Sequence, residues 1–414
     1  MRGLREQAVA AAVTTPAAAA AGSSAAFEAA CVRALPWQWA GTGLNTFFAL
    51  WTFGGSVFLL FLSELGLPKV QIGVVLALFP FCGLLALGFA PVAARLGRKR
   101  VFLGCYGARK VVMAGLLLLP VVTGRLGRGA GVAWLMAVIA LFAILRALAE
   151  TAYYPWAQEA IPNRVRGAFG AVNTAVSTAA ACVALVLAGR VISAGEGLGR
   201  FLWLIGAGCV LGVVSVAVMA PVPGGRPSPA ATDARAYLAA MRAALRDRNF
   251  RRYLEGMGCV TVGTLLFTAF LPLYVRDRLG VAADVVVTLD TAVMLGSALG
   301  GLACGWAADR LGSRPVLMPA LFLNLLVPLG WMILPRQTPH AVVWCAMLYA
   351  GYGIAGSAVG IAAGRLLFNG VIPPERNTAY TAIYYAWMGL TGGAAPLLAG
   401  ALLEVCGERS AALG

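Results

Sequence analysis

Asp290 is an acidic residue inside the long apolar run "VVVTLDTAVML", with no basic residue within one helical turn. An ionisable side chain in such a run is costly inside a membrane, so it is a candidate for function by default. Partial desolvation favours the protonated carboxyl group, which suits a proton carrier or a ligand for a solute. We predict one of these roles for Asp290. The alternative is a side chain that reaches a water-filled outer vestibule.

Arg146 and Glu150 form a second charged group within an apolar run. They are four residues apart, so in a helix they lie on one face and can form an ion pair. Arg109 and Lys110 lie about two turns into a neighbouring predicted helix, counted from the same membrane side. One interpretation makes Arg146 and Glu150 a charge or proton relay. The other is a neutralised structural cluster whose Arg and Lys side chains extend toward the membrane surface.

Other kinds of chemistry lack the residues that they need. The chain has one histidine, His340, and its nine cysteines form no CxxC or CxxxC pair, so we expect no metal site. It has no GxxxxGK(S/T) motif for ATP and no nucleophile–base arrangement. The net charge of +16 is spread over short loops rather than gathered on one basic domain, which argues against nucleic acid as a partner. We expect neither enzyme activity nor a cofactor.

The charged residues stand out because the chain around them is apolar. Of its 414 residues, 60% are hydrophobic and 12% are charged, and the mean hydropathy is +0.83. A soluble domain carries about 25% charged residues, and a helix needs roughly 20 apolar residues to cross a bilayer. The runs are continuous rather than alternating, which indicates helices. We predict an all-α membrane protein with eleven spans, at residues 40–62, 70–93, 101–122, 131–154, 169–192, 201–221, 253–274, 285–308, 315–334, 341–367 and 379–403.

The segments outside these spans predict the topology. Lys and Arg are about twice as frequent on the side of the N-terminus, which places that terminus in the cytoplasm. Residues 1–36 are rich in alanine and are expected to form a disordered cytoplasmic tail. Residues 223–252 are expected to form a cytoplasmic linker with an amphipathic helix, either on the membrane surface or in solvent. The segment after residue 403 is too short to cross.

A basic turn occurs twice, as "AARLGRKR" at residues 93–100 and as "ADRLGSRP" at residues 308–315. Each copy follows an even-numbered span, and Ala94 and Asp309 occupy equivalent positions 215 residues apart. The segments 160–170 and 371–380 form a second similar pair. Parallel repeats around a central site are a known plan for transporters. We therefore predict an N-terminal six-helix bundle at 37–222 and a C-terminal bundle of five spans at 253–414, with the twelfth helix of a 6+6 plan missing.

The second turn resembles the signature of the major facilitator superfamily, G-x-x-x-D-R/K-x-G-x-R/K. The segment "GWAADRLGSR" at residues 305–314 matches it at every defined position. The first turn keeps Arg95, Gly97 and Lys99, but has alanine at the positions of the glycine and the acid. Arg146 and the prolines and arginine that follow it resemble the arginine motif of helix 4 in that family. The resemblance covers nearly the whole chain and implies a fold of two pseudo-symmetric helical bundles.

The resemblance also implies roles for individual residues. In the family, the basic turn acts as a latch for the outward-open state. The expected latch in the C-terminal half is Asp309, Arg310, Gly312 and Arg314. Arg95 and Gly97 belong to a weaker latch in the N-terminal half, since Ala94 cannot supply the acid. Glu150 becomes a proton site that Arg146 modulates. Four residues lie where the family has its cavity and are candidates for lining it: Asn45, Trp51, Asn173 and Tyr384.

Taken together, these observations predict a secondary active transporter in the plasma (inner) membrane. It is expected to move a small organic solute by alternating access, with proton coupling, as a multi-pass monomer in contact with lipid and without nucleic acid. The alternative is a relative that does not transport and serves as a membrane sensor or assembly partner. The absence of an acid at Ala94 and of a twelfth span favours that alternative.

Overall fold

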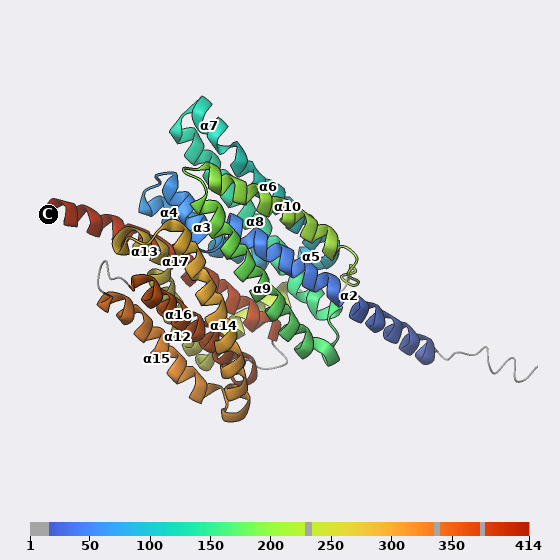
Figure 1. The fold of residues 1–414 in the computed structure, drawn as a ribbon. Helices are drawn as coiled ribbons and strands as arrows, with labels where there is room; N and C mark the ends of the chain where they lie inside the picture. The colour runs from blue at the N-terminus through green and yellow to red at the C-terminus, as the bar shows by residue number, and fades with distance from the viewer. Residues whose placement is uncertain (1–15, 228–233, 335–339, 373–376, 414) are drawn as a thin grey trace, which may run out of the picture.

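The structure is a computed structural model that describes residues 16–227, 234–334, 340–372 and 377–413. Every regular element within these residues is a helix. Figure 1 shows the N-terminal helices, in blue to green, beside the C-terminal helices, in yellow to red. We call residues 16–227 the N half and residues 234–413 the C half. The all-α fold predicted from the sequence is confirmed.

The described part of the N half is built from nine α-helices with short 3₁₀ segments between some of them. They are α2 (Pro16–Thr52), α3 (Gly55–Glu64), α4 (Lys69–Cys82), α5 (Ala86–Leu96), α6 (Arg98–Ala114), α7 (Leu119–Leu126), α8 (Arg128–Ala160), α9 (Arg166–Ser193) and α10 (Gly199–Met219), with 3₁₀ turns at Gly83–Leu85, Gly115–Leu118 and Asn163–Val165. In this description α2 and α3 form the first predicted span, which bends at Phe53 and Gly54.

The C half begins with the linker helix α11 (Ala234–Arg246). The helices that follow are α12 (Arg248–Thr268), α13 (Leu271–Leu279), α14 (Ala283–Leu311), α15 (Ser313–Ile333), α16 (Ala341–Leu366) and α17 (Asn377–Leu413), with a π-helical turn at Leu367–Val371. The two halves meet where α4 packs against α17 and where α9 packs against α14. These two contacts join the halves along their length.

Most predicted spans are confirmed as membrane-length helices. Within the described residues, ten helical segments are long and apolar enough to cross a membrane. The predicted second span, 70–93, is different because Pro80 lies inside α4 and a 3₁₀ turn separates α4 from α5, so its apolar helix, Lys69–Leu85, is shorter. The described chain begins and ends at opposite ends of the bundle, as an odd number of crossings requires (Figure 1). The count of eleven stays a prediction.

The expected disordered tail is wrong for residues 16–36, which are helical and continue into α2. Alanine is the best helix former, so the composition that suggested a tail also extends the helix. Leu35 is buried against Ile161 and Phe169, and Glu28 forms an ion pair with Arg164 at 2.7 Å. These contacts come from the α8–α9 junction, which the local sequence does not reveal. Residues 1–15 lie outside the described residues.

The linker helix α11 packs on the C half instead of standing free. Ala244 is fully buried in a cluster with Phe250 and Tyr380. Asp247 then caps α12, because its carboxylate accepts hydrogen bonds from the backbone N–H groups of Asn249 and Phe250. The expected amphipathic helix is therefore present, docked against α12 and α17. The domain boundaries at residues 222 and 252 stay a prediction.

Candidate functional site

A cavity of ≈ 430 Å³ lies between the two halves. Residues of both halves line it, from α2, α3 and α4 on one side and from α12, α13, α14, α16 and α17 on the other. Its walls are mostly apolar, and the residues with polar side chains that line it are Ser56, Thr268, Asp290, Tyr349 and Tyr352. Among these lining residues Asp290 is the only charged one. The volume is in the range of small-molecule sites, roughly 300–1,000 Å³.

Asp290 joins the two halves at the wall of this cavity. It lies on α14, and its Oδ2 atom accepts a hydrogen bond from the backbone N–H of Ser56 at 2.9 Å. Both residues are buried. Ser56 is in the first turn of α3, where backbone N–H groups have no partner within the helix and a negative charge is favoured. The carboxylate of the C half thus stabilises the N-terminus of a helix in the N half.

A similar contact occurs nearby between Glu404 and α4. The Oε2 atom of Glu404, on α17, accepts a hydrogen bond from the backbone N–H of Val70 at 3.0 Å. Arg276 of α13 also donates to the hydroxyl of Ser63 on α3, at 2.9 Å. Together with the Asp290 contact, these two hydrogen bonds join the halves. All three lie at the end of the bundle opposite the two basic turns, which we call the outer end.

The backbones of the two halves approach each other closely at the outer end. A Cβ atom on Gly73 of α4 would lie 2.5 Å from the carbonyl oxygen of Pro396 on α17. A Cβ atom on Gly400 of α17 would lie 2.6 Å from the carbonyl oxygen of Lys69. Neither distance is compatible with a side chain unless a helix moves. The outer end is therefore closed by direct helix–helix packing in addition to hydrogen bonds.

The predicted pair of Arg146 and Glu150 is confirmed as an ion pair on one face of α8. The Nε atom of Arg146 donates to Oε1 of Glu150 at 2.7 Å. The guanidinium group also lies over the ring of Phe53, at 5.3 Å from its centroid. Both side chains are partly exposed. Their role as a proton or charge relay stays a prediction.

Arg109 and Lys110 do not extend toward the membrane surface, so that part of the structural interpretation is wrong. Both side chains are buried in the N half. Lys110 donates to the side-chain oxygen of Asn45 at 2.8 Å and lies over the ring of Tyr106 at 3.6 Å. Arg109 lies over the same ring at 4.4 Å. The sequence identified both cations as residues of interest, but Asn45 and Tyr106 as their partners could not be found without the fold.

The four predicted cavity residues do not line this cavity. Asn45 binds Lys110 inside the N half. Trp51 is buried, and its indole N–H donates to the carbonyl of Ala184 on α9 at 2.8 Å, so it holds two helices of the N half together. Asn173 lies on α9, and Tyr384 packs against Tyr253 and Tyr385. Polar and aromatic residues inside a bundle are used here for packing between helices, which their residue types alone do not distinguish from ligand binding.

The basic turn of the C half has one ion pair, within that half. Asp309 accepts from the guanidinium of Arg365 on α16, and the guanidinium of Arg310 lies 4.4 Å from the ring centroid of Trp306. Arg314 is exposed. Gly312 has φ +88°, a left-handed value that suits glycine. The latch role of this turn stays a prediction. No hydrogen bond or ion pair links this turn to the N half among the described residues.

The basic turn of the N half is held by the segment that follows α10. Gly97 has φ +96°, and the backbone N–H of Lys99 donates to the carbonyl of Gly225 at 3.4 Å. Glu159, at the end of α8, accepts from the backbone N–H of Gly225 at 2.9 Å. Arg95 is exposed. Glu159 is an acid that the sequence pattern missed, because it comes from α8 and not from α5, the helix that carries Ala94.

Comparison with known proteins gives one family and several similar structures. The family model of the Major Facilitator Superfamily matches residues 40–396. No curated protein matches the chain significantly. A mutant of the nucleoside transporter NupG is similar with a TM-score of 0.68 at 14% identity, over 89% of this chain and 92% of that one. The D-xylose-proton symporter has a TM-score of 0.64 at 16% identity, over 88% of each chain.

A third similar structure is a bacterial homologue of the human lysosomal transporter Spinster in an inward-facing and unoccupied conformation. Its TM-score is 0.62 at 16% identity, over 90% of this chain and 81% of that one. At these identities, the structural likeness establishes the shared fold of two helical bundles. This likeness does not show that the present chain has the same substrates.

Proposed function

The chain belongs to the Major Facilitator Superfamily, and on that premise we propose that it is a secondary transporter that moves a small organic solute by alternating access. The observation that supports this is the cavity of ≈ 430 Å³ between the halves, with Asp290 as the one charged residue in its lining. A site between two bundles can open to either side when the bundles rock against each other. We place the protein in the plasma membrane as a monomer with its N-terminus in the cytoplasm.

The lining of the cavity favours a solute with a large apolar surface and few polar groups. Most of the wall is aliphatic, while Tyr349, Tyr352 and Thr268 offer hydroxyl groups for hydrogen bonds. Few and well-placed polar groups in an apolar pocket are what orients a small ligand. A carboxylate in the same wall adds an acceptor that a cationic or hydroxyl group can use.

We further propose that Asp290 couples this movement to protons. A buried carboxylate without a cationic partner is more easily protonated than an exposed one. Protonation removes the charge that Asp290 places at the N-terminus of α3, so the contact between the halves weakens. A proton taken up from the outer side therefore favours opening of that side. Closure of the contact expels the proton and favours the inward-facing arrangement.

The test is uptake by the purified full chain in proteoliposomes with an imposed pH gradient. A thermal-shift screen first selects solutes from a panel of nucleosides, pentoses, amino acids and amines that carry large apolar groups. The panel starts with nucleosides and D-xylose, the solutes named for two similar structures. We expect accumulation of a selected solute, faster when the outside is acidic. Counterflow without a pH gradient is then measured as well. It requires transport of the solute but no proton coupling, so it separates the two properties.

Failure of these assays has a definite meaning. If a solute stabilises the protein but neither uptake nor counterflow is seen, the protein binds without transporting, as a membrane sensor does. If transport occurs at the same rate at every pH and with Asp290→Asn, proton coupling through Asp290 is refuted and the transporter assignment stands.

A further inference from the structure

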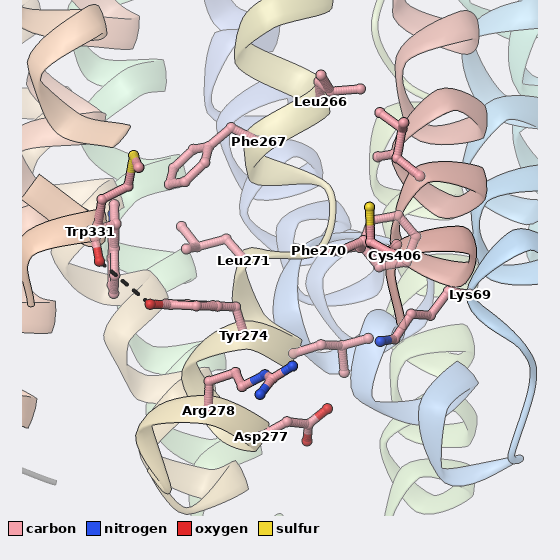
Figure 2. Close-up of a pocket in the computed structure, with 15 residues that line it drawn as sticks. Lys69, Leu266, Phe267, Phe270, Leu271, Tyr274, Asp277, Arg278, Trp331 and Cys406 are labelled. Carbon is pink, nitrogen blue, oxygen red and sulfur yellow. Dashed lines mark hydrogen bonds between the residues drawn. The ribbon is translucent and has the colours of Figure 1, made fainter. Parts of the chain in front are cut away.

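A second cavity, of ≈ 460 Å³, lies in the outer part of the C half. It is a groove lined by α12, α13, α15 and α17 and by Lys69 at the start of α4. Figure 2 shows its two regions: apolar side chains such as Leu266 and Phe267 lie at one end, and the charged groups of Lys69, Asp277 and Arg278 at the other. The lining of the groove is therefore complementary to an amphiphile, because an apolar wall ends at a polar rim.

The groove is part of a face whose counterpart in the N half is covered. In the N half, α10 packs against α2 and α6. The repeat offset of 215 residues places Gly256 of α12 at the position of Gly41 of α2. A Cβ atom on Gly41 would lie 2.4 Å from Met219 of α10, whereas one on Gly256 or Gly263 would meet nothing within 4 Å. Within the described residues, no helix covers this face of α12 and α15.

The exposed side chains of this face match a bilayer. On α15, Phe322, Leu325, Met332 and Ile333 are each more than half exposed. Large apolar side chains that are exposed in a membrane protein contact lipid tails. The wall of the groove continues this surface into the molecule, and acyl chains of the adjacent leaflet have direct access to it.

The rim of the groove carries positive charge without partners. Lys69 and Arg278 are exposed, and neither forms a hydrogen bond or an ion pair through its side chain among the described contacts. Asp277 is engaged by Arg276, which binds it at 2.7 Å. The two unpaired cations therefore favour an anionic group at the rim. A phosphate group offers the acceptor oxygens that Lys and Arg bind best.

We propose that this groove binds one anionic phospholipid from the leaflet at the outer end of the protein. An acyl chain lies along the wall formed by Phe267, Leu271 and Leu402, and the head group lies between Lys69 and Arg278. A transmembrane helix is the other conceivable occupant of such a face, but two cations at the mouth of the groove favour an anionic head group over an apolar helix. The lipid joins α4 of the N half to α13 of the C half, since Lys69 and Arg278 belong to different halves. This assignment does not depend on the identity of a transported solute.

The experiment is native mass spectrometry of the full chain, titrated in detergent with phosphatidylglycerol or with phosphatidylcholine of the same acyl chains. We expect one phosphatidylglycerol to be retained about tenfold better than phosphatidylcholine. Lys69→Gln and Arg278→Gln should each weaken that retention about fivefold, since one basic residue near an anionic lipid contributes about a factor of this size. Arg125→Gln is the matched control. Arg125 is an exposed cation of the N half that also lies at the outer end, but it does not line the groove.

Three outcomes would overturn the proposal. The first is equal retention of the two lipids. The second is an Arg125→Gln variant that loses phosphatidylglycerol as strongly as the Lys69 and Arg278 variants. The third is a tightly bound second polypeptide that crosslinks to Cys406 in the groove and displaces the lipid, which would identify the face as a protein interface. Thermal unfolding of each variant in detergent verifies that it is folded, and the substituted cations are exposed, so their replacement leaves the core intact.

Discussion

Replacing Asp290 with asparagine should release the outer end of the protein. The carboxylate binds the backbone N–H of Ser56 at 2.9 Å in a buried setting. A hydrogen bond to a charged group contributes about 1.5–3 kcal/mol and a neutral one about 0.5–1.5 kcal/mol. Asparagine keeps an acceptor oxygen and a similar shape, so the change removes the difference, about 1–2 kcal/mol. The population that is open at the outer end should therefore rise about 5- to 30-fold.

The assay is a distance measurement between spin labels at the outer end. Leu126 of α7 and Ile333 of α15 are highly exposed and belong to different halves, so labels there report separation of the halves. The exposed Cys259 and Cys406 are first replaced by serine. We expect the long-distance population to grow in the Asp290→Asn variant. Lowering the pH should produce the same change in the unmodified chain, because protonation removes the same charge. It should have a smaller effect on the variant, in which only the weaker Glu404 contact can still be protonated.

Glu404→Gln is the matched control for this prediction. Its contact with the N–H of Val70 is of the same kind but exposed to solvent, where screening keeps the contribution below about 1 kcal/mol. The shift should therefore be smaller than for Asp290. Unchanged distances in Asp290→Asn at every pH, or a larger shift in Glu404→Gln than in Asp290→Asn, would show that the charge on Asp290 does not hold the outer end closed.

Three further predictions follow from contacts of the described residues. Gly73→Ala places a Cβ atom 2.5 Å from a backbone carbonyl of α17 and should open the outer end by about 1–3 kcal/mol in the same distance assay, whereas Gly88→Ala, with nothing within 4 Å, should not. Asn45→Leu removes the acceptor of the buried Lys110 amino group and should lower the free energy of unfolding by about 1–3 kcal/mol, which a second change, Lys110→Met, should largely restore. No restoration would show that the unpaired amino group is not the cause. Asp309→Asn breaks an exposed ion pair and should cost less than about 1 kcal/mol of stability, so a large shift between conformations with unchanged stability would support the latch role.

The helices were predictable from the sequence because composition alone determines them. Runs of about 20 apolar residues have few alternatives to a helix in a membrane. The second predicted span fails as one continuous helix because Pro80 and the 3₁₀ turn at Gly83–Leu85 interrupt it. The helix at residues 16–36 was missed because the contacts that stabilise it come from distant parts of the chain. Its alanines form a helix once Leu35 has Ile161 and Phe169 to pack against, and those partners are more than 100 residues away in the sequence.

The candidate site was predictable only in part. Asp290 could be identified because an unpaired acid in an apolar run is conspicuous in any sequence. Its partner could not, since the donor is a backbone N–H group that is free only because the first span bends before Ser56. The family resemblance and their residue types made Trp51 and Asn45 candidates for lining the cavity, and both instead bind groups within the N half. Residue type predicts that a polar group needs a partner, while the fold decides whether the partner is the protein or a ligand.

The carboxylate of Asp290 links ligand binding to conformational change, because one group takes part in both. The same carboxylate group that lines the cavity accepts the hydrogen bond that joins α14 to α3. A proton or a solute group that binds this carboxylate competes with the N–H of Ser56, so it binds better when the halves have separated at the outer end. A ligand shifts an equilibrium only by its difference in affinity for the two states, and this competition supplies such a difference. If the proposed function is correct, binding of a proton or solute from the outer side and opening of that side occur together. In both, the carboxylate of Asp290 exchanges the N–H of Ser56 for the ligand.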